Sequence, residues 1–580
     1  MSRFYLGTQM KKSTIVIGLD AAEPRLIEEW MAAGHLPNLS KIHQQGTYSR
    51  LDNTVNYCGV ATEYSTTEPL WATFNTGCRA DTLGYWDTVS YNPENYEIVC
   101  DVVTSGYDYQ EYPPFYALGK DYKVAVLDVP VTTLSDKVEG SQILGWGGHY
   151  PYTVSASNPP ELFSAITEKY GKNPVLHNDN GLWWNPEYVS WIQSAVGESI
   201  DGHSAIARDL LKQDDWDLFL MVFGETHTIG HDLYNHSQPD HPTYNYLTDN
   251  GTKADPVLKT YKHVDQAIGE ILAEAPEDAN IVCFSAHGMA ANFTDLLSMA
   301  VLPELLYRLH YGKAAIAPGE VGTKPSPMIT KPIRNSWPGE IWSQVSESNP
   351  LKKLFRTWTH KKFLREKKHG LLSPYSLLDE PIEKEVAMGW MPGMWYSELW
   401  PEMKAFALPA FTNGHIRINL KGREKNGVVK ATEYDSLCAE ITEMLYDLRD
   451  GRTGAKIVKQ VVKTRTIPLD DNPKLPDADI VVIWQEPITD VVDSPKLGRV
   501  GPLTHCRAGG HKGQGFFLGK GPDIPAGLEL TPGEAVDLAP TILGLMNAEI
   551  PEYLDGKSLL TNVVTSSSSC LLYTSPSPRD

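Results

Sequence analysis

The sequence has no pair of cysteines in C-x-x-C spacing, and its seven cysteines are scattered along 580 residues. An odd number of scattered cysteines argues against a disulfide framework, so we expect reduced, buried thiols in a cytoplasmic protein. The N-terminal stretch MSRFYLGTQMKKSTIVIGLD lacks the continuous apolar segment and the small-residue cleavage site of a signal peptide. No apolar run reaches the length of about 18 residues that a transmembrane helix needs.

Positive charge is also scarce. The chain has 51 Lys and Arg against 72 Asp and Glu, which gives a formal net charge of -21. This balance argues against general nucleic-acid binding and against docking to an anionic membrane surface. An acidic enzyme that acts on an anionic substrate needs local positive charge, and a bound metal ion supplies it. The apolar fraction of 41% is typical of a globular protein.

Short apolar runs alternate with helix-like segments along the chain. These runs are STIVIGLD (13–20), YKVAVLDVP (122–130), DLFLMVFGE (217–225), NIVCFSAHG (280–288) and DADIVVIWQ (477–485). The first is followed by EPRLIEEWMAAGHL, whose apolar residues Leu26, Ile27 and Trp30 recur at helical spacing. The alternation predicts an α/β fold with a mostly parallel central sheet and helices on both faces.

Polar side chains follow several of these runs. Asp20, Glu225 and His287 stand at or just beyond predicted strand ends, where open α/β sheets bind their ligands. His227 and His231 are four residues apart and share one face if their segment is helical. An H-x-x-x-H spacing arises by chance in a chain with 17 histidines, but its coincidence with the strand-end residues favours a metal site.

Two further segments extend this candidate site. His511 lies in the glycine-rich stretch RAGGHKGQGFFLGKG, before a predicted strand. The stretch STTEPLW places Thr66 and Thr67 shortly before Pro69, which is also good chemistry for a helix start. The two interpretations of Thr67, helix start and nucleophile, are compatible because the helix dipole favours negative charge at that position.

The sequence resembles the type I phosphodiesterase and nucleotide pyrophosphatase family of the alkaline phosphatase superfamily, in particular its predicted phosphohydrolase/phosphomutase group. The resemblance extends over most of residues 13–560. The stretches that carry it occur in the family's order: IGLDAAEPRLIEEW with GHLPNLSKI, TEPLWATFNTG, FGETHTIGH, FSAHGM, AFALPAFTNGHIRINLKGRE, GGHKGQGFFLGKGPDI and DLAPTILGLMNAEIPEYLDGKSL.

This resemblance implies an alkaline phosphatase-like fold and two zinc-like ions that flank a Thr or Ser nucleophile. Thr67 matches the nucleophile by its register with the following proline and T-G pair. Asp20 matches the strand-end aspartate of the second metal, and His287 matches the histidine of the S-D-H-G motif. His231 matches the histidine of the first metal's D-x-x-x-H motif, and His511 matches the late histidine that completes that site.

The chain departs from the family pattern at three positions. His227 replaces the aspartate of D-x-x-x-H, Ala286 replaces the aspartate of S-D-H-G, and Thr88 stands where nucleotide-cleaving relatives carry a phosphoryl-binding asparagine. We therefore expect a neutral three-imidazole site that suits zinc. The second metal site keeps only Asp20, His287 and the Thr67 oxygen as ligands, so we expect it to bind its ion weakly or to recruit Glu225 or water.

The predicted function is metal-dependent hydrolysis of small-molecule phosphate esters, diesters rather than monoesters, through a phospho-threonine intermediate. A phosphomonoesterase or phosphomutase, a sulfatase-like hydrolase and a catalytically degenerate binding protein are the alternatives. A sulfatase is disfavoured because the stretch Thr67–Trp71 has no Cys or Ser to become formylglycine and no arginine. The sequence names neither the substrate nor the oligomeric state.

The expected domain organisation is a core interrupted by an insertion. We expect a first core part at 10–295, an inserted cap at 296–400, a second core part at 401–560 and a disordered tail at 561–580. The insertion contains the basic run LKKLFRTWTHKKFLREKK and the aromatic run WMPGMWYSELWPEM. The aromatic residues of the second run suggest walls for a substrate pocket.

Overall fold

The computed structural model describes residues 12–100, 107–148, 154–176, 181–244, 255–325, 336–347, 349–351, 354, 367–378 and 386–560. The expected disordered tail at 561–580 and most of the basic run at 351–368 lie outside these residues. Within the described ranges, no helix combines the length and the apolar composition needed to cross a bilayer.

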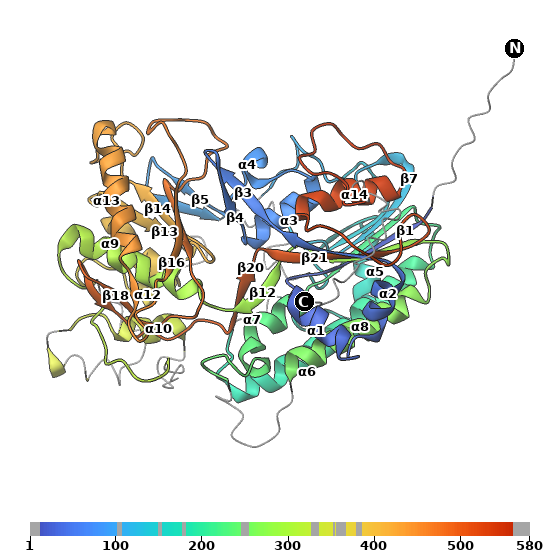
Figure 1. Cartoon of the computed structure of the whole chain (residues 1–580), viewed down its shortest axis with the longest axis horizontal. Coiled ribbons are helices and arrows are strands. Elements are labelled where there is room, and N and C mark those ends of the chain that lie inside the picture. The colour runs from blue at the N-terminus through green and yellow to red at the C-terminus, as the bar shows by residue number, and fades with distance from the viewer. Residues whose placement is uncertain are drawn as a thin grey trace, which may run out of the picture.

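A nine-stranded sheet forms the centre of the larger lobe of the molecule (Figure 1). In spatial order its strands are β22 (Leu528–Glu529), β2 (Thr47–Asp52), β21 (Gln514–Lys520), β11 (Asn280–Ser285), β1 (Thr14–Leu19), β10 (Leu218–Phe223), β7 (Gly119–Leu127), β8 (Val138–Leu144) and β9 (Ala156–Asn158). The central strands β11, β1, β10, β7 and β8 are parallel to one another, whereas β21 pairs antiparallel with β11 and β9 pairs antiparallel with β8. The prediction of a mostly parallel central sheet is confirmed.

Helices cover both faces of this sheet because its strands are apolar on both sides. Along β1, Ile15 and Ile17 enter one apolar core and Val16 enters the other. The first core includes α1 (Pro24–Ala32), α2 (Pro37–Gln45), α5 (Glu161–Tyr170), α6 (Pro186–Leu211), α7 (Glu225–Ser237) and α8 (Pro256–Leu272). The opposite core includes α3 (Thr67–Thr76), α4 (Ala80–Leu83), the 3₁₀ turn η6 (Ala535–Asp537) and α14 (Leu538–Leu545).

A second lobe lies beside the large sheet (Figure 1). Its four-stranded sheet has the order β13 (Ala405–Leu408), β14 (Gly414–Ile418), β17 (Ile480–Trp484) and β16 (Val458–Lys463), and a smaller sheet has the order β15 (Arg449–Asp450), β18 (Val492–Ser494) and β19 (Gly498–Val500). Its helical elements are η1 (Leu297–Val301), α9 (Leu302–Tyr311), α10 (Trp337–Ser343), α12 (Pro374–Leu378), η4 (Pro392–Leu399), η5 (Ala431–Glu433) and α13 (Tyr434–Tyr446).

Three two-stranded antiparallel sheets complete the described elements. They are β3 (Thr54–Tyr57) with β4 (Val60–Glu63), β5 (Val89–Asn92) with β6 (Glu97–Cys100), and β12 (Gly288–Ala291) with β20 (Gly509–Lys512). The β12–β20 ribbon runs between the two lobes in Figure 1. It places β12, which follows the central strand β11, beside β20, which follows the second lobe in the chain.

The assignment of residues 477–485 to the central sheet is wrong. The run forms β17, which pairs antiparallel with β14 and β16 in the second lobe. All five residues of β17 are buried, as in a central strand of the large sheet. A short, continuously apolar run indicates burial on both faces but does not specify which sheet supplies the neighbours.

Residues on both sides of the expected boundary at 400 belong to one apolar core. This core joins residues from Leu296 to Leu503 with residues of the β5–β6 hairpin. We therefore propose that the insertion extends to about residue 503. Trp395 and Trp400 are at most 1% exposed within this core, so these two side chains support the lobe and do not line an open pocket.

Candidate active site

Three predicted site residues meet at the carboxyl edge of the large sheet. Asp20 follows β1, Glu225 follows β10 and begins α7, and His287 follows β11. These strands are neighbours, in the order β11, β1 and β10. The backbone N–H of Asp20 donates to the carbonyl of Phe223 across 2.9 Å, which ties the ends of β1 and β10 together.

Three buried imidazoles converge next to this edge. α7 carries His227 and His231 on one face, and β20 brings His511 against them. The Nε2 atom of His511 lies 2.8 Å from Nε2 of His231 and 3.1 Å from Nε2 of His227. Nitrogen ligands about 2.0–2.1 Å from a tetrahedral zinc ion lie about 3.3 Å from one another, so the cluster is close to the size of a zinc site.

Hydrogen bonds on the outer side set the tautomers of two of these rings. Nδ1 of His231 donates to the carbonyl oxygen of Gly509 across 2.8 Å. Nδ1 of His227 faces Oδ2 of Asp20 at 2.8 Å and donates to it. Both rings therefore turn an Nε2 lone pair toward the centre of the cluster. Metal-binding histidines commonly have such carbonyl and carboxylate partners, so the donor set fits a divalent metal ion.

Asp20 is an ionised carboxylate with both oxygens in use. Burial alone would raise its pKa, but the neighbouring imidazoles of His227 and His287 hold it well below the usual range. Oδ1 accepts a hydrogen bond from the indole nitrogen of Trp71 at 2.9 Å, while Oδ2 is occupied by His227. Asp20 is thus arranged to orient an imidazole, and it is outside the group of converging ligand atoms formed by the described residues.

Thr67 lies directly against the imidazole cluster. Its Oγ1 atom is 2.6 Å from Nδ1 of His511, and only 6% of the residue is exposed. Thr67 is the first residue of α3, and no side chain caps the start of that helix. The hydroxyl therefore combines a histidine partner with the positive end of a helix dipole.

The second metal site predicted from the family lacks a carboxylate in the structure. Ala286 is fully buried in the apolar core beneath α3, and its carbonyl accepts a hydrogen bond from the side chain of Asn53 at 2.7 Å. Nε2 of His287 lies 3.3 Å from Oδ1 of Asp20 but has no well-directed hydrogen bond among the described residues. Asp20 and His287 are thus brought together without the missing ligand, and Thr67 adjoins them through His511, whose ring contacts that of His287.

Glu225, predicted as a possible accessory ligand, belongs to another buried network. Its Oε1 atom is 2.6 Å from Nδ1 of His203, whose Nε2 atom lies 2.8 Å from Oδ2 of Asp128. Burial alone would lower the pKa of His203, but the two carboxylates raise it to about 10. No pattern in the sequence indicated this network as a whole. Asp128 directly follows β7, so its strand-end position was a usable signal, whereas His203 lies in a helix without a motif.

Replacing His203 by glutamine should lower the free energy of unfolding by about 3–5 kcal/mol at neutral pH, because two buried carboxylates lose their partner. The folded-state pKa of about 10 exceeds the ordinary 6.5, so the contribution is complete below pH 6.5 and disappears as the pH rises through about 10. Urea denaturation at neutral pH and above about pH 10 checks this. An equal loss of stability at both pH values contradicts this prediction. The partly exposed His263, which pairs with Asp201, offers a control.

Thr88, the other possible accessory residue, lies just before β5. Its hydroxyl donates to Oδ1 of Asp87 across 3.3 Å and makes no hydrogen bond to the imidazole cluster within the described part of the chain. Burial, followed by the charge of Glu68, raises the pKa of Asp87 to about 7. The structure thus places an acidic pair near Thr67, and a phosphoryl contact of Thr88 stays a prediction.

Arg507 is a neighbour of the cluster that the sequence analysis did not single out. Its Nη1 atom is 3.1 Å from Nε2 of His231. It lies four residues before His511 within RAGGHKG, so its nearness in sequence to a predicted ligand was the available signal.

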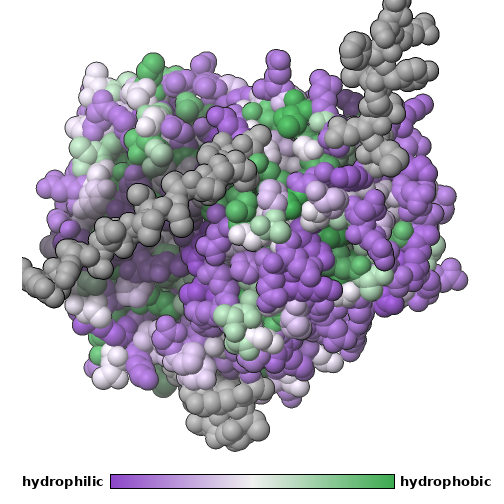
Figure 2. All heavy atoms as spheres, turned by 45° about the vertical axis from the view of Figure 1, so that its right-hand side comes forward, coloured by the Kyte–Doolittle hydropathy of each residue, from purple (hydrophilic) through white to green (hydrophobic). Residues whose placement is uncertain are grey.

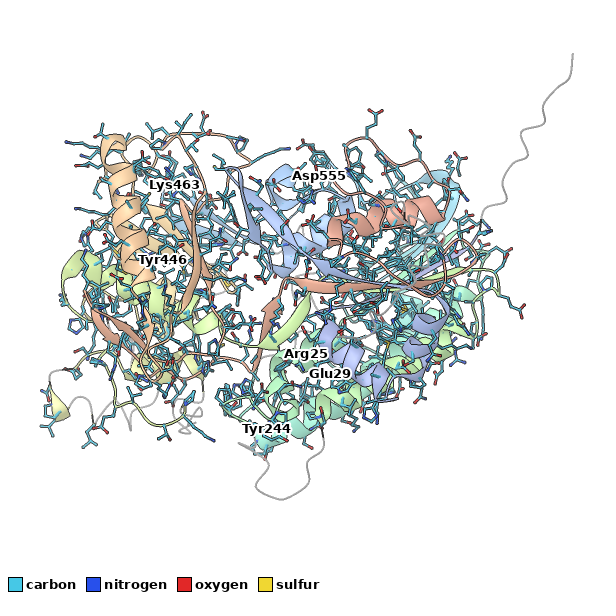
Figure 3. All side chains as sticks on the ribbon, in the orientation of Figure 1. Arg25, Glu29, Tyr244, Tyr446, Lys463 and Asp555 are labelled. Atoms are coloured by element: carbon cyan, nitrogen blue, oxygen red, sulfur yellow. The ribbon has the colours of Figure 1, made fainter. Side chains whose placement is uncertain are left out.

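A cavity of about 680 Å³ lies elsewhere and does not contain the site. Its lining includes Lys512 but none of the predicted site residues. Arg25 and Glu29, which also line it, project from α1 in Figure 3 and pair across 2.9 Å. The face shown in Figure 2 is mostly hydrophilic, with hydrophobic residues in small separate patches. The convergence of side chains, and not the size of a cavity, therefore identifies the candidate site.

Comparison with known proteins gives one family match. The profile of the family described as "Type I phosphodiesterase / nucleotide pyrophosphatase" matches residues 14–317, more than half of the chain. A comparison with curated proteins found no match.

Several solved structures align with this chain along most of its length. Phosphonoacetate hydrolase from Sinorhizobium meliloti 1021, in complex with phosphonoformate, has 12% sequence identity and a TM-score of 0.45. An inactive variant of murine ectonucleotide pyrophosphatase / phosphodiesterase 5, in complex with AMP, has 11% identity and a TM-score of 0.45. Each alignment covers 93% of this chain and 96% of the other. At such low identities, the chemistry of the site rests on this chain's own residues.

Proposed function

The chain belongs to the type I phosphodiesterase / nucleotide pyrophosphatase family, and from this premise we propose that it is a metal-dependent hydrolase of phosphate esters with Thr67 as its nucleophile. Diesters are the preferred substrates. The observation that carries the proposal is the position of Thr67 Oγ1, 2.6 Å from a histidine of the imidazole cluster at the start of α3. Serine and threonine need such an adjacent activating group to act as nucleophiles.

The reaction proceeds by two displacements at phosphorus. The Thr67 hydroxyl gives up its proton, and its oxygen attacks phosphorus in line with the leaving oxygen. The bond between phosphorus and the leaving oxygen breaks, and the leaving oxygen takes up one proton in exchange for the one that Thr67 released. The phosphoryl group, with its remaining ester arm, stays bonded to Thr67. Water then attacks the same phosphorus, releases a phosphate monoester and returns a proton to the threonine oxygen.

His511 prepares the threonine oxygen for attack. When Nε2 of His511 presents a lone pair to the cluster, the ring proton resides on Nδ1 and is donated to Thr67 Oγ1 across 2.6 Å. A hydrogen bond to the oxyanion favours the charged form and lowers the pKa of the hydroxyl. The start of α3 adds favourable electrostatic energy in the same direction.

The three Nε2 atoms of His227, His231 and His511 are the proposed ligands of a divalent ion. Three neutral imidazoles suit zinc, which also leaves a fourth position open in catalytic sites. Such an ion supplies Lewis-acid stabilisation of phosphoryl and threonine oxygens. Ala286 removes a ligand and a negative charge from the second site, so we propose that one ion is held tightly and a second weakly.

Hydrolysis of a chromogenic diester tests the proposal. Zinc-loaded protein should release p-nitrophenolate from bis(p-nitrophenyl) phosphate faster than from p-nitrophenyl phosphate, a chelator should stop the reaction, and added zinc should restore it. The buried methyl group of Ala286 favours a second candidate, a binding protein with a degenerate site. No release with zinc demonstrably bound would support that alternative.

A further inference from the structure

Arg507 combines charge, burial and position in a way that the proposed mechanism does not yet use. It precedes β20 and is close to the imidazole cluster, with Nη1 3.1 Å from Nε2 of His231. Its side chain is 19% exposed. A guanidinium remains charged at any physiological pH, so this position holds a fixed positive charge beside the predicted metal ligands.

The orientation of the guanidinium is set by two partners from other segments. Nε donates to Oδ2 of Asp295 across 2.7 Å, and Asp295 is itself buried and bonded by the side-chain amide of Asn292 at 2.8 Å. The guanidinium carbon lies 5.2 Å from the ring centre of Phe411, which supports the planar group through a cation–π contact. Neither Nη atom bonds Asp295, and Nη2 has no hydrogen-bond acceptor within the described ranges.

Asp295 compensates the guanidinium charge at Nε and leaves Nη2 available to a further anion. The Nη1–H group of Arg507 donates to the lone pair of His231 Nε2, which is the lone pair that a metal ion would need. Metal binding therefore deprives this N–H of its acceptor and leaves it directed at the region next to the ion. A phosphoryl oxygen is the natural replacement acceptor, because arginine presents a planar pair of donors to phosphate.

We propose that Arg507 is the anion-binding residue of this site and donates to a nonbridging oxygen of the phosphoryl group. This inference rests on the proposed function. Ala286 weakens the second metal site, which removes a positive charge that would neutralise the phosphoryl oxygens. The guanidinium supplies a replacement charge from the protein itself, held in place by Asp295 and Phe411.

Binding of inorganic phosphate to zinc-loaded protein, measured by isothermal titration calorimetry after removal of free zinc, tests the inference. Arg507→Met should weaken phosphate binding at least about tenfold, and Arg507→Lys, which keeps the charge but not the fork, should recover part of the loss. Loss of one such contact should lower kcat/KM for the diester by about 10²–10³-fold. Zinc content, measured in every sample, should stay equal to that of the wild type.

Arg452 provides the matched control. It pairs with buried Asp490 and is 13% exposed, similar to Arg507, but it makes no contact with the imidazoles in the described part of the chain. Arg452→Met should leave phosphate affinity unchanged, which separates a local role from a general loss of a buried ion pair. An equal loss in both variants overturns the inference.

The outcomes separate this inference from the proposed function. If wild-type protein hydrolyses the diester and Arg507→Met binds phosphate normally, the inference is overturned and the function stands. If wild-type protein binds phosphate through Arg507 but hydrolyses no ester, the inference stands and the function falls. If Arg507→Met and Arg507→Lys both lose zinc, Arg507 supports His231 instead, and the anion-binding role is overturned.

Discussion

Replacing Thr67 by alanine lowers the rate of diester hydrolysis by about 10⁴–10⁶-fold, the scale seen when a nucleophile is removed from an otherwise intact site. The effect is large because the hydroxyl is the atom that attacks phosphorus, and its partner His511 has no other acidic hydroxyl within hydrogen-bonding distance among the described residues. Zinc content should change little, because the three imidazoles that hold the tight ion are retained. Thermal stability should fall only by the small contribution of one hydroxyl and one γ-methyl group at the start of α3. Release of p-nitrophenolate under zinc-loaded conditions measures the rate.

Thr66 is the matched control for this experiment. It is adjacent in sequence and similarly buried, but its hydroxyl lies 3.3 Å from that of Thr412 and makes no hydrogen bond to the described imidazoles. Thr66→Ala should retain activity within a few-fold of the wild type. Comparable losses in both variants, or near-normal turnover by Thr67→Ala, contradict the assignment of the nucleophile.

Replacing His231 by alanine should remove most of the bound zinc and lower the rate by about 10³-fold or more. The imidazole supplies one of three converging Nε2 atoms, and its Nδ1 bond to Gly509 orients it before metal binds. Loss of an outer-shell partner typically costs 10–100-fold in metal affinity or activity, and loss of a direct ligand should cost more. Elemental analysis of dialysed protein and the diester assay measure the two effects on the same sample.

His263 serves as the control because it is partly exposed and pairs with the exposed Asp201 across 2.8 Å. His263→Ala should keep both zinc and activity. Full zinc content in His231→Ala would show that the imidazole cluster is not the tight metal site. The proposed mechanism would then need another source of positive charge.

Much of the candidate site is accessible from sequence because parallel strands end at a common edge. Asp20 and His287 follow apolar runs, and the structure places these runs beside each other. His227 and His231 meet through helical spacing on α7, which needs no knowledge of the fold. The position of His511 depends on the pairing of β20 with β12, in which Met289 lies opposite His511, and only the family resemblance indicated that contact.

The remainder of the site depends on tertiary contacts that leave no local pattern. His203 joins Asp128 and Glu225 from three separate elements, and a single buried histidine on a long helix has no distinguishing spacing. Arg507 is defined by Asp295, more than 200 residues earlier in the chain. The error at residues 477–485 has the same origin, since an apolar run specifies burial but not its partners.

Trapping the covalent intermediate tests the central claim most directly. Zinc-loaded protein is mixed with excess bis(p-nitrophenyl) phosphate, quenched in acid within the first turnover, digested and analysed by mass spectrometry. The proposed mechanism predicts a p-nitrophenyl phosphoryl group, or the phosphate left after its hydrolysis, on the peptide that contains Thr67, and no such adduct in Thr67→Ala. Burst release of p-nitrophenolate with Thr67 unmodified, or an adduct on another residue, would contradict it.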